Sequence, residues 1–96
     1  MNDTVAAPAH SLDSIVDHLD RFHQRATYGA VARILNRPPR NLMSGRERNE
    51  RSSWIVSREN GLPTGYAPEQ THPQIAEREK VLDTGEGLSS WLQNPA

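Results

Sequence analysis

The fold is decided by one stretch of the chain, Thr27-Tyr28-Gly29-Ala30-Val31-Ala32-Arg33-Ile34-Leu35-Asn36-Arg37-Pro38-Pro39-Arg40. It reads as a short amphipathic helix, a break at the two prolines, and the basic start of a second helix. Thr27 is a suitable N-cap for the first helix, and Asn36 is a suitable stop. Two short helices joined by a tight break are typical of a helix-turn-helix, a unit that usually contacts nucleic acid.

Two further helices are predicted around this stretch. Residues 11–23 place Leu12, Ile15, Val16, Leu19 and Phe22 at helical spacing, and Ser11 is a suitable N-cap. The helix after the break is expected to run from about Pro38 to Gly45, with Leu42 and Met43 turned inward. Residues 1–10 have no periodicity and are expected to form a flexible arm, so that 11–96 make a single domain.

The second half of the chain predicts strands and one last helix. Trp54-Ile55-Val56-Ser57 has strand propensity, and Glu59-Asn60-Gly61 is a hairpin turn that leads into Leu62-Pro63-Thr64-Gly65-Tyr66. Val81-Leu82 suggests a short strand, and Thr84 caps a docking helix through Leu88, Trp91 and Leu92. Three helices followed by a hairpin predict an α+β fold, a small winged helix-turn-helix domain with a C-terminal docking helix.

The charges are segregated along the chain, although the net charge is only −1. Between positions 21 and 58, nine arginines stand against Glu47 and Glu50, and both flanks are acidic. Arginine suits bidentate contacts with phosphates and base edges, so the middle of the chain predicts a polyanion-binding face. The alternative is a solvated surface whose arginines pair with the protein's own acids.

Composition excludes several kinds of chemistry. The 96 residues include no cysteine, which removes disulfides, thiolate metal ligands and cysteine nucleophiles. His18 and His23 are five residues apart, off the spacing that places two metal ligands on one helical face. No signal peptide or membrane span is visible, and the mean hydropathy is −0.78. The sequence therefore predicts a cytoplasmic protein that is no enzyme and has no metal, cofactor or membrane partner.

Part of the chain resembles a known family. Thr27-Tyr28-Gly29-Ala30-Val31-Ala32, the arginine at Arg40, and Trp54-Ile55-Val56 followed by the Gly61 turn resemble the DNA-binding domain of O6-alkylguanine-DNA alkyltransferases. The resemblance extends to their non-catalytic relatives, the alkyltransferase-like proteins, and covers roughly residues 26–66. Its first motif matches well, Arg40 matches within a few residues, and the proline-cysteine-histidine-arginine-valine motif matches poorly.

The departures from the family decide what the resemblance implies. The receptor cysteine of the family is absent, and either Trp54 or Ser52 stands at its position. In neither register do the family's histidine and arginine follow. Covalent alkyl transfer needs a thiolate activated by a histidine, so the resemblance predicts DNA binding without repair chemistry.

The resemblance gives two residues a mechanistic role. Tyr28 would crowd a phosphate and help to rotate a nucleotide outward, and Arg40 would enter the base stack in its place. The alternative is that Tyr28 packs at a helix start and Arg40 pairs locally. The candidate nucleic-acid contacts are Tyr28, Arg33, Arg37, Arg40, Asn41, Ser44, Arg46, Arg48 and Arg58.

The candidates for a base pocket are Ser52, Trp54 and Tyr66. A tryptophan in a strand is more often core than a stacking platform, and the Leu62-to-Tyr66 stretch is interpreted as a buried return strand or, alternatively, a wing tip. The sequence predicts a DNA-binding protein, duplex favoured, that recognises modified or flipped bases. The alternative is a small regulator whose arginine face binds an acidic protein partner.

Overall fold

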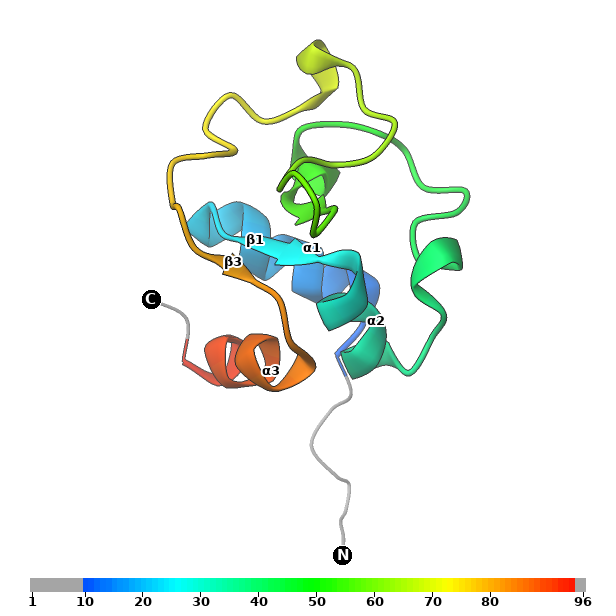
Figure 1. Ribbon diagram of the computed structural model, residues 1–96, viewed down its shortest axis with the longest axis vertical. Coiled ribbons are helices and arrows are strands. Elements are labelled where there is room, and N and C mark those ends of the chain that lie inside the picture. Colours follow the sequence, from blue (N-terminus) through cyan, green and yellow to red (C-terminus); the bar gives the residue numbers. More distant parts are fainter. Residues whose placement is uncertain (1–9, 95–96) are drawn as a thin grey trace, which may run out of the picture.

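The computed structural model describes residues 10–94 as three helices packed against a small sheet (Figure 1). The predicted arm, residues 1–10, lies outside the described residues except for His10. The elements follow the order α1 (Leu12–Phe22), β1 (Arg25–Thr27), α2 (Tyr28–Leu35), β2 (Ile55–Val56), β3 (Val81–Leu82) and α3 (Gly85–Gln93). Three short 3₁₀ helices lie between them, η2 (Pro39–Asn41), η3 (Arg51–Trp54) and η4 (Pro68–Gln70). The fold is a small α+β arrangement.

Each of the three α-helices begins at a capping side chain that the sequence predicts. Ser11 Oγ accepts from the backbone N–H of Ser14 at 3.0 Å, and Thr27 Oγ1 accepts from that of Ala30 at 3.1 Å. Thr84 Oγ1 accepts from Gly87 in α3 at 2.9 Å. These bonds satisfy backbone donors that would otherwise have no partner in the first turn. The predicted helices at 11–23, after Thr27 and after Thr84 are confirmed within a residue or two.

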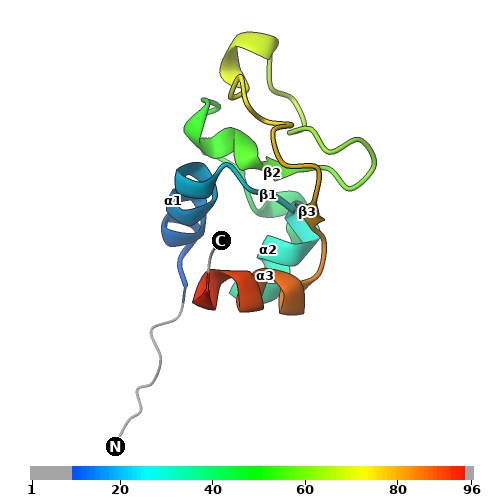
Figure 2. The same cartoon turned by 90° about the vertical axis from the view of Figure 1, so that its left-hand side faces the viewer.

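The sheet is parallel throughout, in the order β2-β1-β3. Ala26 of the central strand lies in register with Ile55 of β2 and with Leu82 of β3. In Figure 2 the three helices lie on one side of the sheet, and the chain from Ser57 to Lys80 lies beyond its other side. Because the strands are parallel, their carboxyl ends, Thr27, Val56 and Leu82, meet at one edge. At that edge α2 begins directly after β1.

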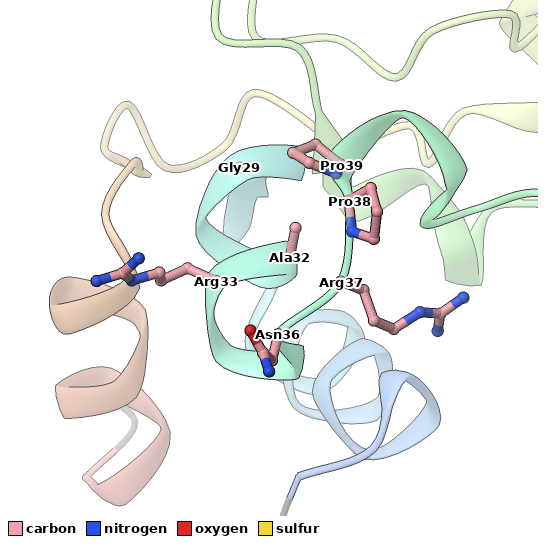
Figure 3. A pocket seen from close by; sticks show the side chains of 7 residues that line it. All are labelled: Gly29, Ala32, Arg33, Asn36, Arg37, Pro38 and Pro39. Carbon is pink, nitrogen blue, oxygen red and sulfur yellow. The ribbon is translucent and has the colours of Figure 1, made fainter.

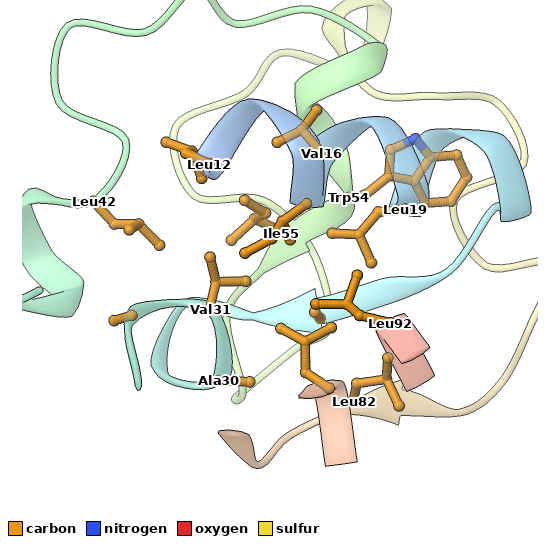
Figure 4. Packing of buried hydrophobic residues seen from close by; sticks show 14 residues of the cluster. Leu12, Val16, Leu19, Ala30, Val31, Leu42, Trp54, Ile55, Leu82 and Leu92 are labelled. Atoms are coloured by element: carbon orange, nitrogen blue, oxygen red, sulfur yellow. The ribbon is translucent and has the colours of Figure 1, made fainter. Parts of the chain in front are cut away.

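The core is built where the helices face the sheet (Figure 4). Ile15, Leu19 and Leu88 are completely enclosed, as is the indole of Trp54. Burial of such side chains contributes about 2 kcal/mol each to stability. The remaining members of the cluster are Leu12, Val16, Ala26, Ala30, Val31, Ala32, Leu42, Ile55, Leu82 and Leu92.

The predicted hairpin is wrong. A backbone bond of 2.9 Å from Ser57 N–H to the carbonyl of Leu62 closes the turn at Gly61, whose φ is +70°. The chain after the turn forms no strand, since Pro63 has no N–H to donate to a ladder. Ile55 and Val56 pair with β1 instead, and Trp54 belongs to η3 rather than to a strand. The winged-helix form that depends on the hairpin is therefore not observed.

The predicted helix from Pro38 to Gly45 is also wrong. Only Pro39–Asn41 is helical, as a single 3₁₀ turn, and irregular turns follow. Asn41, Ser44 and Gly45 favour turns over helix, and Leu42 is the only fully buried side chain of the segment. A helix with so little apolar surface to bury gains too little from packing to form.

Candidate nucleic-acid interface

The arginines of the basic segment separate into three groups according to their partners. Arg46 pairs with Asp13 at 2.6 Å, Arg51 pairs with Asp17, and Arg58 bonds Asp83 through Nε and Nη2 at 3.0 and 2.8 Å. These pairs match the alternative in which the arginines neutralise the protein's own acids. They place two predicted contact residues, Arg46 and Arg58, in ion pairs.

Arg25 forms the second group alone, because its side chain is 9% exposed. Its guanidinium donates to the carbonyls of Gly61 and Arg78, both at 2.9 Å, and more weakly to Glu79 at 3.4 Å. It has no carboxylate partner among the described residues. Arg25 therefore fastens two loops to the outer face of the sheet and is not available to a ligand.

The third group consists of exposed arginines whose side chains form neither a hydrogen bond nor an ion pair within residues 10–94: Arg21, Arg33, Arg37, Arg40 and Arg48. All of them except Arg21 line hollows around α2. We call these four side chains the free-arginine face. Their charge has no internal counterpart in the described part of the chain, so they are the cations most available to an anionic ligand.

A first hollow of about 400 Å³ lies along the exposed side of α2 (Figure 3). It is lined by Gly29, Ala32, Arg33, Asn36, Arg37, Pro38 and Pro39, with no acidic residue. The guanidinium groups of Arg33 and Arg37 reach outward on opposite sides of it. The stem of Arg33 crosses α3 at Gly85, where a Cβ would come within 2.5 Å of Arg33 Cγ. Gly85 thus gives Arg33 room to lie in this position.

A second hollow of about 550 Å³ adjoins the first, since Pro39 lines both. Its other lining residues are Tyr28, Arg40, Met43, Ser44, Arg48 and Thr64, again without an acid. Tyr28, Pro39 and Met43 supply apolar surface, and Arg40 and Arg48 supply positive charge. This combination suits a flat, apolar group that carries a phosphate. Of the predicted contacts, Tyr28, Arg40, Ser44 and Arg48 meet here, whereas Asn41 is exposed nearby in the chain but does not line the hollow.

Tyr28 occupies the first turn of α2, at the carboxyl end of the central strand. Its hydroxyl oxygen accepts a hydrogen bond of 2.9 Å from the backbone N–H of Thr64. Within residues 10–94 nothing accepts the hydrogen of that hydroxyl. The phenol therefore keeps one donor for a ligand.

The loop of residues 62–66 contributes Thr64 to the second hollow, and a contact with Ser52 holds the loop in addition to the Tyr28 bond. The hydroxyl of Tyr66 lies 2.6 Å from Ser52 Oγ. Burial raises the pKa of Tyr66 above its usual value of 10.0, against the opposing effect of the Ser52 hydrogen bond. Gly65 has φ +79°, and a Cβ there would lie 3.5 Å from the guanidinium of Arg48. Sequence reasoning missed Met43 and Thr64 as lining residues, although the Pro63 and Gly65 that position Thr64 were visible.

The three residues predicted as a base pocket do not form an open one. Trp54 is completely buried, donates from Nε1 to Asp20 at 2.9 Å, and stacks on His23 with ring centroids 5.2 Å apart. Ser52 is buried and donates to the carbonyl of Glu47 at 2.9 Å, and Tyr66 closes over it. Trp54 is thus a core residue, as the packing interpretation expected.

No group of three or more histidines, aspartates or glutamates is arranged to hold a metal ion in residues 10–94. None of the helices in that range is long and apolar enough to span a membrane.

Comparison with known proteins adds no relative. No family model, no curated protein and no solved structure matches the chain. The resemblance to alkyltransferase-like proteins therefore depends on its motif residues alone.

Proposed function

We propose that this protein binds nucleic acid, with duplex DNA favoured, and that it does so without covalent chemistry. The observation that carries the proposal is the free-arginine face: Arg33, Arg37, Arg40 and Arg48 are exposed and unpaired among the described residues, and they line two adjoining hollows that contain no acid. Phosphate neutralisation by such cations supplies most of the affinity in nonspecific binding.

Tyr28 is the proposed centre of this interface. Its unused hydroxyl donor and its place in the first turn of α2 suit a phosphate. The resemblance to alkyltransferase-like proteins gives a tyrosine in this motif the same role. The second hollow, between Tyr28, Met43 and Thr64, is the candidate position for an unstacked base.

The chain has no regular α-helix directly after Pro38 that could act as a recognition helix. An α-helix that enters a major groove would have to be longer than the single turn of η2. We therefore propose that contact is made by the arginine side chains of the loop and by the α2 N-terminus, which read backbone shape rather than base sequence.

The test is a titration of the purified protein against a short fluorescent duplex, with and without one O6-methylguanine, over a series of salt concentrations. Arg40→Ala and Arg48→Ala are each expected to weaken binding about fivefold to tenfold, in line with the loss of one phosphate contact. Arg21→Ala is the matched control, because the Arg21 side chain is exposed and has no partner in residues 10–94 but lies outside the face. Equal losses from all three variants would contradict the assignment of the face.

Tyr28→Phe separates binding from folding. It removes the hydroxyl donor and the 2.9 Å bond to Thr64 but keeps the ring in place. We expect weaker binding with little change in thermal stability. Absence of salt-sensitive binding to either duplex, together with binding to an acidic protein, would replace the proposal with the protein-partner alternative.

A further inference from the structure

Two arginines of the basic segment are held by aspartates on α1. Arg46 Nη1 donates to Asp13 Oδ1 at 2.6 Å. Arg51 Nη2 donates to the carboxylate of Asp17 and also, at 3.5 Å, to the backbone carbonyl of Asp13. Asp13 and Asp17 are four residues apart and therefore lie one above the other on the helix. Helix α1 thus presents two stacked carboxylates to the loop that carries the arginines.

These ion pairs are open to solvent. The side chains of Arg46 and Arg51 are 34% and 43% exposed, and those of Asp13 and Asp17 are 65% and 64% exposed. Exposed pairs contribute little to stability, and salt screens them. The pKa of Asp13 is lowered by its hydrogen bond to Arg46 and by the charges of Arg46 and Arg51, so both cations act on one carboxylate. An anionic ligand can replace such partners at low cost.

The paired arginines adjoin the free-arginine face along the chain. Ser44 and Arg48 line the second hollow, and Arg46 lies between them, with its N–H bonded to the carbonyl of Met43 at 3.1 Å. A polyanion seated on Arg40 and Arg48 therefore contacts the chain within two residues of Arg46. Arg51 lies beyond it, against the same helix.

We propose that Asp13 and Asp17 act as internal competitors of nucleic acid for Arg46 and Arg51. The two aspartates occupy, in the free protein, the positions that phosphates take in the complex. Binding then exchanges two internal ion pairs for phosphate contacts, and the aspartates weaken binding and its salt dependence. This inference rests on the proposed function, because it concerns the regulation of the same interface.

The experiment uses the double variant Asp13→Asn, Asp17→Asn, which keeps the shape of both side chains. Binding to the fluorescent duplex is measured by anisotropy over a salt series. Release of both arginines is expected to tighten binding about tenfold at low salt and to steepen the dependence of log K on log salt by about one to two. Circular dichroism and a thermal melt confirm that the variant is folded.

Two controls separate competition from simple charge. Glu59→Gln, Glu69→Gln changes the net charge by the same amount at exposed acids that form no ion pair within residues 10–94. We expect about a twofold effect from this long-range change. In an Arg46→Ala, Arg51→Ala background, the Asp13 and Asp17 substitutions should have no effect beyond that control.

The outcomes are distinguishable. Equal tightening by both acid-to-amide variants, or tightening that persists without Arg46 and Arg51, would overturn the competition. Wild-type binding that the Asp13 and Asp17 substitutions leave unchanged would overturn it too, while the proposed function stands. A wild-type protein that binds no nucleic acid even at low salt would overturn both.

Discussion

At the scale of the residue, the arginines of this chain occupy three kinds of environment: buried, ion-paired and exposed without a partner. Arg25 is buried and bonds loop carbonyls, Arg46 pairs with Asp13 of α1, and the Arg40 side chain has no partner among the described residues. Sequence alone assigns all of them to one basic surface. The partners that separate them come from distant positions, such as Gly61 for Arg25 and Asp13 for Arg46, so the division could not be predicted from local pattern.

Arg25→Ala is expected to destabilise the fold by about 2–3 kcal/mol, because charge-assisted bonds to part-buried carbonyls and the packing of a buried side chain are lost. Urea denaturation measures this as a lower midpoint. Arg58→Ala serves as the control, since its pair with Asp83 is exposed and is worth at most about 1 kcal/mol. Similar losses of unfolding free energy in the two variants would show that the Arg25 hydrogen bonds do not hold the loops in place.

Ionisation of Tyr66 is expected to lower the stability of the fold at alkaline pH. Its pKa in the folded state is raised by burial, so the unfolded chain ionises first as the pH rises above about 10. Unfolding is then favoured increasingly until the folded-state pKa is passed. Tyr66→Phe removes the hydrogen bond to Ser52 and should lower the free energy of unfolding by about 1 kcal/mol at neutral pH. The free energy of unfolding of this variant should fall less steeply than that of the wild type as the pH rises above about 10. Parallel pH profiles of the free energy of unfolding would contradict this account.

At the scale of the element, capping side chains determine where helices begin. Thr27 is 3% exposed and serves both as the end of β1 and as the cap of α2. The same side chain therefore fixes the position of Tyr28, the first residue of the helix. Loss of the cap should therefore shift Tyr28 in the proposed interface as well as lower the stability of the fold.

Thr27→Ala should cost about 1–2 kcal/mol, the usual effect of removing an N-cap oxygen. Thr27→Ser keeps the oxygen and should cost less. Urea denaturation gives the stabilities, and duplex binding should weaken more for alanine than for serine, since the start of α2 frays. If serine and alanine behave alike, the bond to Ala30 is not what matters at this position.

The elements that the sequence predicted correctly are those with strong local signals. Residues 12–22 combine a cap with apolar side chains at helical spacing, and Thr84 precedes a similar pattern. Arg25–Thr27 was missed as a strand, because a run of three residues is too short for its alternation of polar and apolar side chains to be recognised. Its strand character comes from two partners that lie far along the chain.

The candidate site was predicted only in part, because some of its residues have local signals in the sequence and others depend on distant partners. Tyr28, Arg40 and Arg48 were found from charge and motif, and they do line one hollow. The burial of Trp54 depends on α1, which supplies Asp20 and His23 around its ring. No local pattern near Trp54 contains that information.

At the scale of the whole molecule, β1 connects everything else. It pairs with both other strands, and its Ala26 is completely buried between them and the helices. Leu82 anchors one side of this arrangement and is 6% exposed. The described part of the chain should therefore unfold as one cooperative unit.

Leu82→Ala tests that cooperativity. It is expected to cost about 2–4 kcal/mol, the usual loss for a buried leucine. Tryptophan fluorescence, which reports on Trp54 and Trp91, should change together with helical circular dichroism. Leu62→Ala is the matched control, because Leu62 is 45% exposed and should lose little. Separate transitions by the two probes would show two independent units instead.

The position of β1 also has a consequence for the time course of folding. Its neighbours in the sheet follow it only after long intervening segments, since Ala26 pairs with Ile55 and then with Leu82. Closing such loops costs chain entropy before any strand bond repays it, which slows folding. During synthesis, the apolar face of α2 stays uncovered until β3 and α3 have left the ribosome, since Leu88 of α3 completes the core. The nascent chain is thus most exposed to aggregation and proteases in the interval before α3 emerges.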